Sequence, residues 1–362
     1  MKRIWLLIFA VLVIFSCKKK TDDAKWEGVF GQGNAFSVKT SGETDIIACG
    51  ILDNKPYLIR LSNNMAKETD YKYEADGLFS SLWNDTAIYI AGGSSERKML
   101  LVRIDRKGFE VWDTIVNAGF DVDLTDIIYT GEGTFLATGS ASIDISGSGG
   151  SGLIFIRFDT TGNVIEHKEI TGSGFITAEK TCIDNHGNIY LALTRQNEGA
   201  NTRATVAKFN SDLQKLWETE LYNNPAFAAA TYGISVDGAG NVYVTGKTEV
   251  SRESGKLDNS FLTSLNSAGS VRWKKYTENA NTGTDVEVND NVILMLNRNC
   301  FIVNMANPDD GTDAGVVRLF DVCDSYDTDA VGSDLDLNGN GDLLFAGKKG
   351  DNFYLALKRT GL

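Results

Sequence analysis

Residues 232–248 read YGISVDGAGNVYVTGKT. A turn rich in Asp, Gly and Asn, residues 237–241, separates two stretches in which apolar and polar residues alternate. Alternation is typical of strands, and Gly and Asn supply the positive φ that tight hairpin turns need. The same pattern returns as DNHGNIY at residues 184–190 and as DLNGNGDLLFAG at residues 336–347. The chain therefore contains recurring hairpins.

A second motif follows these turns, and it consists of two strands around a short turn with a tryptophan in the second strand. It reads IDRKGFEVW at residues 104–112, FNSDLQKLW at 209–217 and LNSAGSVRW at 265–273. Weaker copies begin near residues 61, 158, 303 and 357. These copies define seven units of about 50 residues each, a period typical of repeat folds.

Each unit holds about four short strands and no convincing helix, which is the pattern of a β-propeller. We therefore expect an all-β chain that forms a single seven-bladed β-propeller of four-stranded antiparallel blades over residues 26–362. The last unit stops before its tryptophan strand, whereas KWEGVF at residues 25–30 is similar to WETELY at residues 217–222. We expect this N-terminal strand to complete the last blade, close the ring and cover two sheet edges.

Residues 232–248 also resemble the repeat of a bacterial seven-bladed β-propeller family. The turn with its nearby tryptophan is distantly similar to quinoprotein-like propellers. The chain lacks the vicinal cysteine pair and the regular Ala-x-Asp of those enzymes, so we expect no quinone and no other cofactor. The resemblance implies a fold and no defined chemistry.

The first 16 residues have the pattern of a signal peptide. Lys2 and Arg3 precede an apolar run over residues 4–15, shorter than the roughly 20 residues that span a bilayer. Ser16 before Cys17 resembles the bacterial lipobox, in which the cysteine is lipidated; an ordinary signal peptide with an incidental cysteine is the alternative. The charged tether, residues 17–25, resembles lipoprotein starts of Bacteroidetes-type bacteria. This resemblance implies a protein lipid-anchored at the outer membrane, facing the periplasm or exposed at the cell surface.

Composition excludes several classes of protein. With 42% apolar residues the chain can form a core, so it is not largely disordered. A formal net charge of -13 argues against nucleic acid as a partner, and 2 histidines leave little for a metal site. Residues 334–342 resemble the start of a calcium loop, but Phe345 stands where its glutamate belongs, so we expect a hairpin turn and no metal. We expect a monomer.

Four cysteines follow Cys17. Cys49 and Cys182 fall in strands of different units and are expected to be buried thiols. Cys300 and Cys323 flank a predicted hairpin and could form a disulfide in an exported protein.

Long irregular connections at residues 140–152, 195–203 and 249–259 are expected on one face of the disc, with the B–C loops that join the second and third strands of each blade. Variable loops on a rigid scaffold commonly hold binding residues. We therefore predict that three neighbouring blades present a composite surface, although plain solvated loops are the alternative. Its candidate residues are Asp144, Arg195, Arg203, Arg252, Glu253 and Asp258.

Aromatic residues recur before the expected inner strands and could either ring one mouth of the channel or pack between blades. They are Phe36, Phe79, Phe120, Phe175, Phe227 and Tyr326.

No catalytic motif is present, so we expect a non-catalytic cell-envelope lipoprotein that binds a glycan, a peptide or a partner protein. The alternative is a carbohydrate-active hydrolase or lyase with paired carboxylates. Asp285 and Glu287 alternate along one strand face, and Asp121, Asp123 and Asp126 precede another inner strand. A raised carboxyl pKa at the channel mouth favours the enzyme; an aromatic platform without a close acid pair favours binding.

Overall fold

The structure is a computed structural model that describes most of the chain from Lys25 onward. It describes residues 25–41, 45–62, 67–72, 77–83, 87–94, 98–105, 109–117, 122–142, 151–171, 174–197, 199–222, 226–252, 255–277, 281–289, 291–319, 330–360 and 362. All regular structure in these ranges is β-strand. No helix in them has the length and hydropathy to span a bilayer.

Five sheets contain four strands each, and strands adjacent in sequence are antiparallel neighbours. The five are β5 (Gly77–Trp83), β6 (Ala87–Ser94), β7 (Lys98–Asp105) and β8 (Glu110–Asn117); β9 (Val122–Gly131), β10 (Thr134–Ser142), β11 (Ser151–Asp159) and β12 (Val164–Thr171); β13 (Phe175–Ile183), β14 (Ile189–Gln196), β15 (Arg203–Phe209) and β16 (Lys215–Glu220); β17 (Ala229–Val236), β18 (Val242–Arg252), β19 (Gly255–Leu265) and β20 (Val271–Thr277); and β21 (Gly283–Val288), β22 (Ile293–Asn297), β23 (Ile302–Ala306) and β24 (Asp313–Arg318).

The sixth sheet has seven strands, because one strand belongs to both of its halves. Its order is β25 (Ala330–Leu337), β26 (Asp342–Lys349), β27 (Asn352–Arg359), β1 (Lys25–Ser41), β2 (Asp45–Leu52), β3 (Lys55–Leu61) and β4 (Lys67–Lys72). The first part of β1 pairs with β27, from Lys25 opposite Lys358 to Gln32 opposite Asn352. The second part pairs with β2, from Gly33 opposite Leu52 to Ser41 opposite Asp45.

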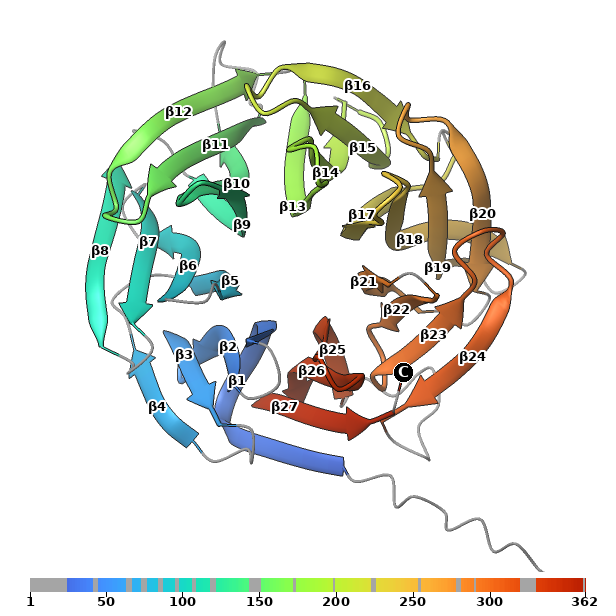
Figure 1. The fold of residues 1–362 in the computed structure, drawn as a ribbon. Helices are drawn as coiled ribbons and strands as arrows, with labels where there is room; N and C mark the ends of the chain where they lie inside the picture. Colours follow the sequence, from blue (N-terminus) through green and yellow to red (C-terminus); the bar gives the residue numbers. More distant parts are fainter. Residues whose placement is uncertain are drawn as a thin grey trace, which may run out of the picture.

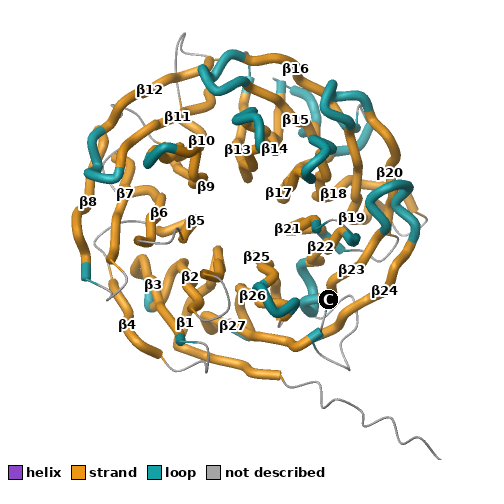
Figure 2. Tube along the Cα trace, in the orientation of Figure 1, coloured by secondary structure: helices purple, strands orange, loops and turns teal. Residues whose placement is uncertain are grey.

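The predicted β-propeller of four-stranded antiparallel blades is therefore confirmed, but the predicted seven separate blades are not. The described residues form six hydrogen-bonded sheets, since β1 runs without a break from one half of the seven-stranded sheet into the other. The sheets stand around a central axis, with β5, β9, β13, β17, β21, β25 and the second part of β1 nearest to it (Figure 1). Short loops join the strands around the disc (Figure 2).

Burial follows distance from the rim of the disc. The third strand of a blade, such as β11 with sequence SGLIFIRFD, is buried on both faces, so it is apolar nearly throughout. The outer strand β12, VIEHKEIT, alternates between exposed and partly buried positions. Neighbouring blades pack through shared clusters, as where Leu136 and Phe155 meet Leu191 and Phe209. The core therefore lies between the blades.

The tryptophan motif is confirmed as packing between blades. Indole Nε1 of Trp112 donates to the carbonyl of Thr160 at 3.1 Å, in the outer turn of the next blade. Trp217 donates in the same way to Ser267, also at 3.1 Å. Each indole thus fixes the outer turn of the following blade, and this repeated contact accounts for the repeated residue.

The turn of residues 237–241 owes its sequence to hydrogen bonds. Oδ1 of Asp237 accepts from the backbone N–H groups of Ala239 and Asn241, and Oδ2 accepts from Asn241 Nδ2 and from the Tyr243 hydroxyl. Gly240 takes φ 80°, which glycine adopts without steric cost. The aspartate therefore organises the turn that feeds the next strand.

Replacing Gly269 by alanine is expected to lower the free energy of unfolding by about 3 kcal/mol, from strain and overpacking together. Its φ is 84°, and a Cβ atom there would lie 2.7 Å from Cδ2 of Trp217. Gly199→Ala is the control, because Gly199 has φ 69° but no atom within 4 Å of an added Cβ, so about 1 kcal/mol is expected. Urea unfolding measures both; equal losses would show that the tryptophan contact contributes nothing.

Candidate ligand site at the channel mouth

Every strand that faces the channel carries a β-bulge at the same place. The bulge inserts one residue that has no partner on the neighbouring strand, and such a residue is turned out of the ladder. The inserted residues are Phe36, Phe79, Thr125, Glu179, Tyr232, Thr284 and Ser333. The bulges therefore supply one layer of side chains around the channel.

This layer surrounds a cavity of about 520 Å³ at one mouth of the channel. It is lined by Asn34, Phe36, Thr125, Glu179, Tyr232, Thr282, Thr284, Arg298, Val331, Gly332, Ser333 and Lys348. Asn34 and Thr282 lie where inner strands begin, and Arg298 follows the second strand of its blade, so the cavity opens on the face of the B–C loops. Its volume falls within the roughly 300–1,000 Å³ of small-molecule sites.

In four inner strands, the residue after the inserted one is buried and binds the next inner strand. Ser37 accepts the N–H of Ser81, Asp126 that of Thr181, Asp285 that of Leu335 and Asp334 that of Val38. Each donor is the second residue after a bulge, where the ladder is locally interrupted. A buried N–H needs a partner, and the side chain of the preceding inner strand provides it.

Lys180 completes this deeper layer from the opposite side of the channel. Its ammonium lies 2.5 Å from Oδ1 of Asp285 and 2.5 Å from Oδ1 of Asp334. β13 is thereby tied to β21 and β25 across the ring (Figure 1). Lys39 contacts the same cluster, 3.6 Å from Glu287 and 4.0 Å from Asp334. The two lysines and their carboxylates form a floor beneath the cavity.

The pKa values of the two aspartates that share Lys180 are shifted in opposite directions. Burial raises the pKa of Asp285, which also makes a hydrogen bond with Asp334. Lys180 and Lys39 outweigh burial at Asp334 and hold the pKa of that carboxyl well below its usual range. The lysines therefore favour the charged form of Asp334.

Of the described residues that line the cavity, Glu179 is the one that carries a carboxylate. Burial raises its pKa to about 7, although a hydrogen bond with Thr194 favours the charged form. The Thr194 hydroxyl also accepts the backbone N–H of Thr231 at 3.3 Å, so the next inner strand fixes its position. Glu179 therefore changes charge near neutral pH.

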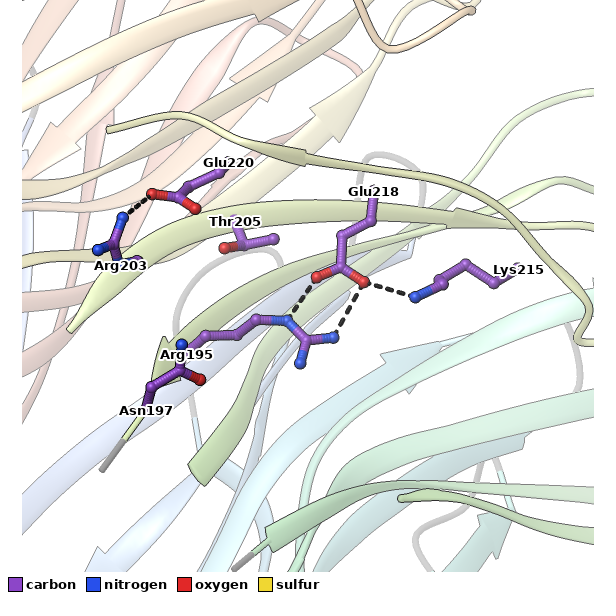
Figure 3. Close-up of a pocket in the computed structure, with 7 residues that line it drawn as sticks. All are labelled: Arg195, Asn197, Arg203, Thr205, Lys215, Glu218 and Glu220. Carbon is purple, nitrogen blue, oxygen red and sulfur yellow. Dashed lines mark hydrogen bonds and ion pairs between the residues drawn. The ribbon is translucent and has the colours of Figure 1, made fainter. Parts of the chain in front are cut away.

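Arg195 and Arg203, two predicted binding residues, lie in a second pocket, on β14 and β15 (Figure 3). Arg195 contacts Glu218 through Nε at 2.5 Å and Nη2 at 2.9 Å. Arg203 pairs with Glu220, and Lys215 lies 2.8 Å from Glu218. The pocket measures about 430 Å³, but every cation in its lining is already paired with a carboxylate. A ligand there would have to displace these pairs.

The structure describes only some of the residues predicted to form the composite surface. Asp258 lies 3.0 Å from Lys247. Burial raises the pKa of Tyr232, and the charges of Lys247, Glu179, Arg298 and Asp258 also act on that pKa. Asp144, Glu253 and the side chain of Arg252 lie outside the described residues. The predicted loop at residues 249–259 is wrong, because β18 and β19 continue as a paired hairpin to Arg252 opposite Gly255.

The predicted pair of carboxylates, Asp285 and Glu287, is held by contacts with other strands. Asp285 is 0% exposed and is held by Lys180 and the N–H of Leu335. Glu287 is paired with Lys39. Asp126 is buried against Ser80 and Thr181, Asp123 is exposed, and Asp121 lies outside the described residues. Asp334 contacts Lys180 of this cluster, and Asp336 accepts the N–H of Thr40 on β1. The two carboxylates are therefore not grouped around a calcium turn.

Among the predicted aromatics, Phe36 lines the cavity and Phe175 is 49% exposed at the start of β13. Phe120, Tyr326 and the side chain of Phe79 lie outside the described residues. Sequence reasoning missed Glu179 and Tyr232, since an inserted residue breaks the alternation that marks strands. Their signal is positional, as each lies five residues before the aspartate that begins the turn of its unit.

Cys300 is disulfide-bonded, whereas Cys49 and Cys182 are free, and burial raises the pKa of both free thiols. The partner of Cys300 is therefore neither of these two. Cys323 lies outside the described residues, and its pairing with Cys300 stays a prediction.

Lys180→Met is expected to lower the free energy of unfolding at pH 7 by about 3–5 kcal/mol, because it leaves buried carboxyls without their cation. Without the ammonium, the folded-state pKa values of Asp285 and Asp334 rise. The loss in free energy of unfolding should then grow from about pH 5 to about pH 8, because the folded state keeps protons that the unfolded chain has released.

Lys208→Met is the matched control for that variant, measured by urea unfolding. Lys208 is also buried, 4.0 Å from Asp184, but Asp184 accepts from Asn188 and Tyr190 as well. We expect a loss of about 1 kcal/mol or less. Equal losses in the two variants would show that Lys180 has no special role in the floor.

Comparisons with known proteins agree with this geometry. Residues 230–251 match the family model described as SBBP, β-propeller repeat. The WD40 β-propeller domain of Doa1 is similar in fold, at TM-score 0.58 and 9% identity over 93% of this chain and 96% of that one. A protein of unknown function from Bacteroides caccae gives TM-score 0.48 and 16% identity over 74% of this chain and 84% of its own. No curated protein matches the sequence. Residues 230–251 therefore carry a β-propeller repeat, and the ring of antiparallel blades has the fold that such repeats build.

Proposed function

We propose that this chain is a non-catalytic binding protein whose ligand site is the cavity at the channel mouth. The supporting observation is that bulges on six inner strands converge on one 520 Å³ space with aromatic, hydroxyl and charged walls. A binding site gains affinity when its groups are held in place before the ligand arrives. The floor of lysines and aspartates holds these strands in position.

Catalysis by Asp285 and Glu287 is the weaker candidate. Asp285 is fully buried and accepts the N–H of Leu335, so its carboxyl serves the contact between strands. A glycosidase needs two carboxyl groups on either side of the scissile bond. One observation does favour an enzyme, namely the raised pKa of Glu179, which suits a general acid. Among the described residues of the cavity lining, no second carboxylate accompanies it.

We further infer that the seven-stranded sheet serves as two blades that share β1, which gives a seven-bladed ring closed by the N-terminal strand. The pairing of Trp26 with Leu357 supports this, because Trp26 then occupies the tryptophan position of the last blade. Trp26 packs against the cluster that joins β2 and β3 to β26 and β27. This arrangement leaves the last blade without an open edge.

The first binding test is a glycan array with residues 25–362, which contain every strand of the structure, scored for binding and for product release. Tyr232→Ala is expected to weaken binding at least about ten-fold, since it removes an aromatic wall of the cavity. Tyr129→Ala, at the other end of an inner strand, should bind as the wild type does.

Binding that Tyr232→Ala leaves unchanged would exclude this cavity as the site, and absence of any binding would exclude glycans as its ligands. Release of product would support the enzyme with Glu179 as its acid. Glu179→Gln would then abolish turnover while retaining binding.

We also propose that Cys17 anchors the protein by lipid at the outer membrane, facing either the periplasm or the outside. The apolar segment at residues 4–15 and the Ser16–Cys17 junction support this. Cys17→Ala is expected to move the protein from the membrane fraction to the soluble fraction, because acyl chains provide the attachment. Fractionation with labelled palmitate checks it; an unlabelled wild-type protein would refute the anchor.

A further inference from the structure

We propose that the cavity at the channel mouth binds a saccharide that carries a carboxylate, a uronic acid unit in particular. This inference rests on the proposed binding function and names the ligand class of that same site.

The first support is charge that the protein does not neutralise. Arg298 and Lys348 line the cavity, and neither has an ion-pair partner among the described residues. In the pocket of β14 and β15, by contrast, Arg195, Arg203 and Lys215 are all paired with glutamates. Two unpaired cations on one wall form charge-assisted hydrogen bonds with a ligand carboxylate.

The other residues around these two cations add little negative charge to the cavity. The whole chain carries a net charge of -13, yet among its described lining residues the cavity has one carboxylate, Glu179. Burial keeps Glu179 largely neutral below about pH 7, and the neutral carboxyl is a hydrogen-bond donor. The mouth of the channel is therefore locally positive on an acidic protein.

The second support is a pair of buried polar atoms that have no partner. Oδ1 of Asn34 and Oγ1 of Thr284 are buried without a hydrogen bond, and both residues line the cavity. An unsatisfied buried polar atom costs about 1–3 kcal/mol unless a ligand or water supplies its partner. Asn34 Oδ1 needs a donor, and a hydroxyl group can both donate and accept.

The remaining lining matches a sugar better than a peptide. The lining contains four further residues with hydroxyl groups, which both donate and accept, namely Thr125, Thr282, Ser333 and Tyr232. The rings of Phe36 and Tyr232 offer apolar surface to the carbon face of a pyranose. Lys180, next to Glu179 in the chain, bridges Asp285 and Asp334 and so ties three inner strands together.

The test compares ligands that differ only at the acidic carbon. Oligomers of glucuronate and galacturonate are titrated calorimetrically into residues 25–362, beside the matching glucose and galactose oligomers and a hexamer of glutamate. We expect the acidic sugars to bind at least about ten-fold more tightly than the neutral ones, with affinity falling as salt is added.

Arg298→Gln and Lys348→Gln are each expected to weaken binding of the acidic sugar about ten-fold and to leave neutral sugars unaffected. Arg298→Lys, which keeps the charge, should recover most of the affinity. Arg203→Gln is the control and should change nothing, since that guanidinium belongs to the other pocket. Matching unfolding curves establish that the variants are folded.

The outcomes separate the two proposals. Equal affinity for acidic and neutral sugars, lost in Tyr232→Ala, would overturn the acidic ligand and retain the binding site. Acidic binding that depends on Arg203 and not on Arg298 would move the site to the pocket of β14 and β15. Tighter binding of the glutamate hexamer would overturn the saccharide as the ligand class, and binding of none of these probes would overturn the acidic saccharide.

Discussion

The ring depends on one kind of hydrogen bond, in which a buried side chain of one inner strand accepts the N–H freed by the bulge of the next. Asp126, Asp285 and Asp334 make this bond, and Ser37 makes its uncharged counterpart. A carboxylate at such a depth requires a counter-charge, and Lys180 supplies it to two strands at once. The same contacts therefore hold the blades together.

The bulge divides the side chains of an inner strand between the cavity and the contacts among strands. The inserted residue lines the cavity, and the next residue joins the strands, as Glu179 and Lys180 illustrate. Because the deeper position is constrained by buried charge, variation is tolerated better at the inserted position. One scaffold can thus present different chemistry at its mouth with the same floor.

The sequence predicted the blades well because turn and tryptophan motifs repeat contacts that are local or lie between adjacent units. Asp237 organises its own turn, and Trp217 reaches only the next blade. The cavity escaped prediction because it joins residues from distant units, and because Glu179 stands outside the alternation that identifies strands. Arg195 and Arg203 line one pocket, but their glutamate partners on β16 could not be inferred without the register. The shared strand β1 changed the sheet count for the same reason.

The place of β1 has a consequence for how the chain acquires its fold. Lys25 pairs with Lys358, so the first strand to be synthesised waits for the last one before its outer half is hydrogen-bonded. Contacts between such distant residues slow folding, since the chain entropy is lost before the pairing is gained. Until then both β27 and the free half of β1 present open edges to other chains. A chaperone that shields the two ends until they meet would therefore favour correct folding over aggregation.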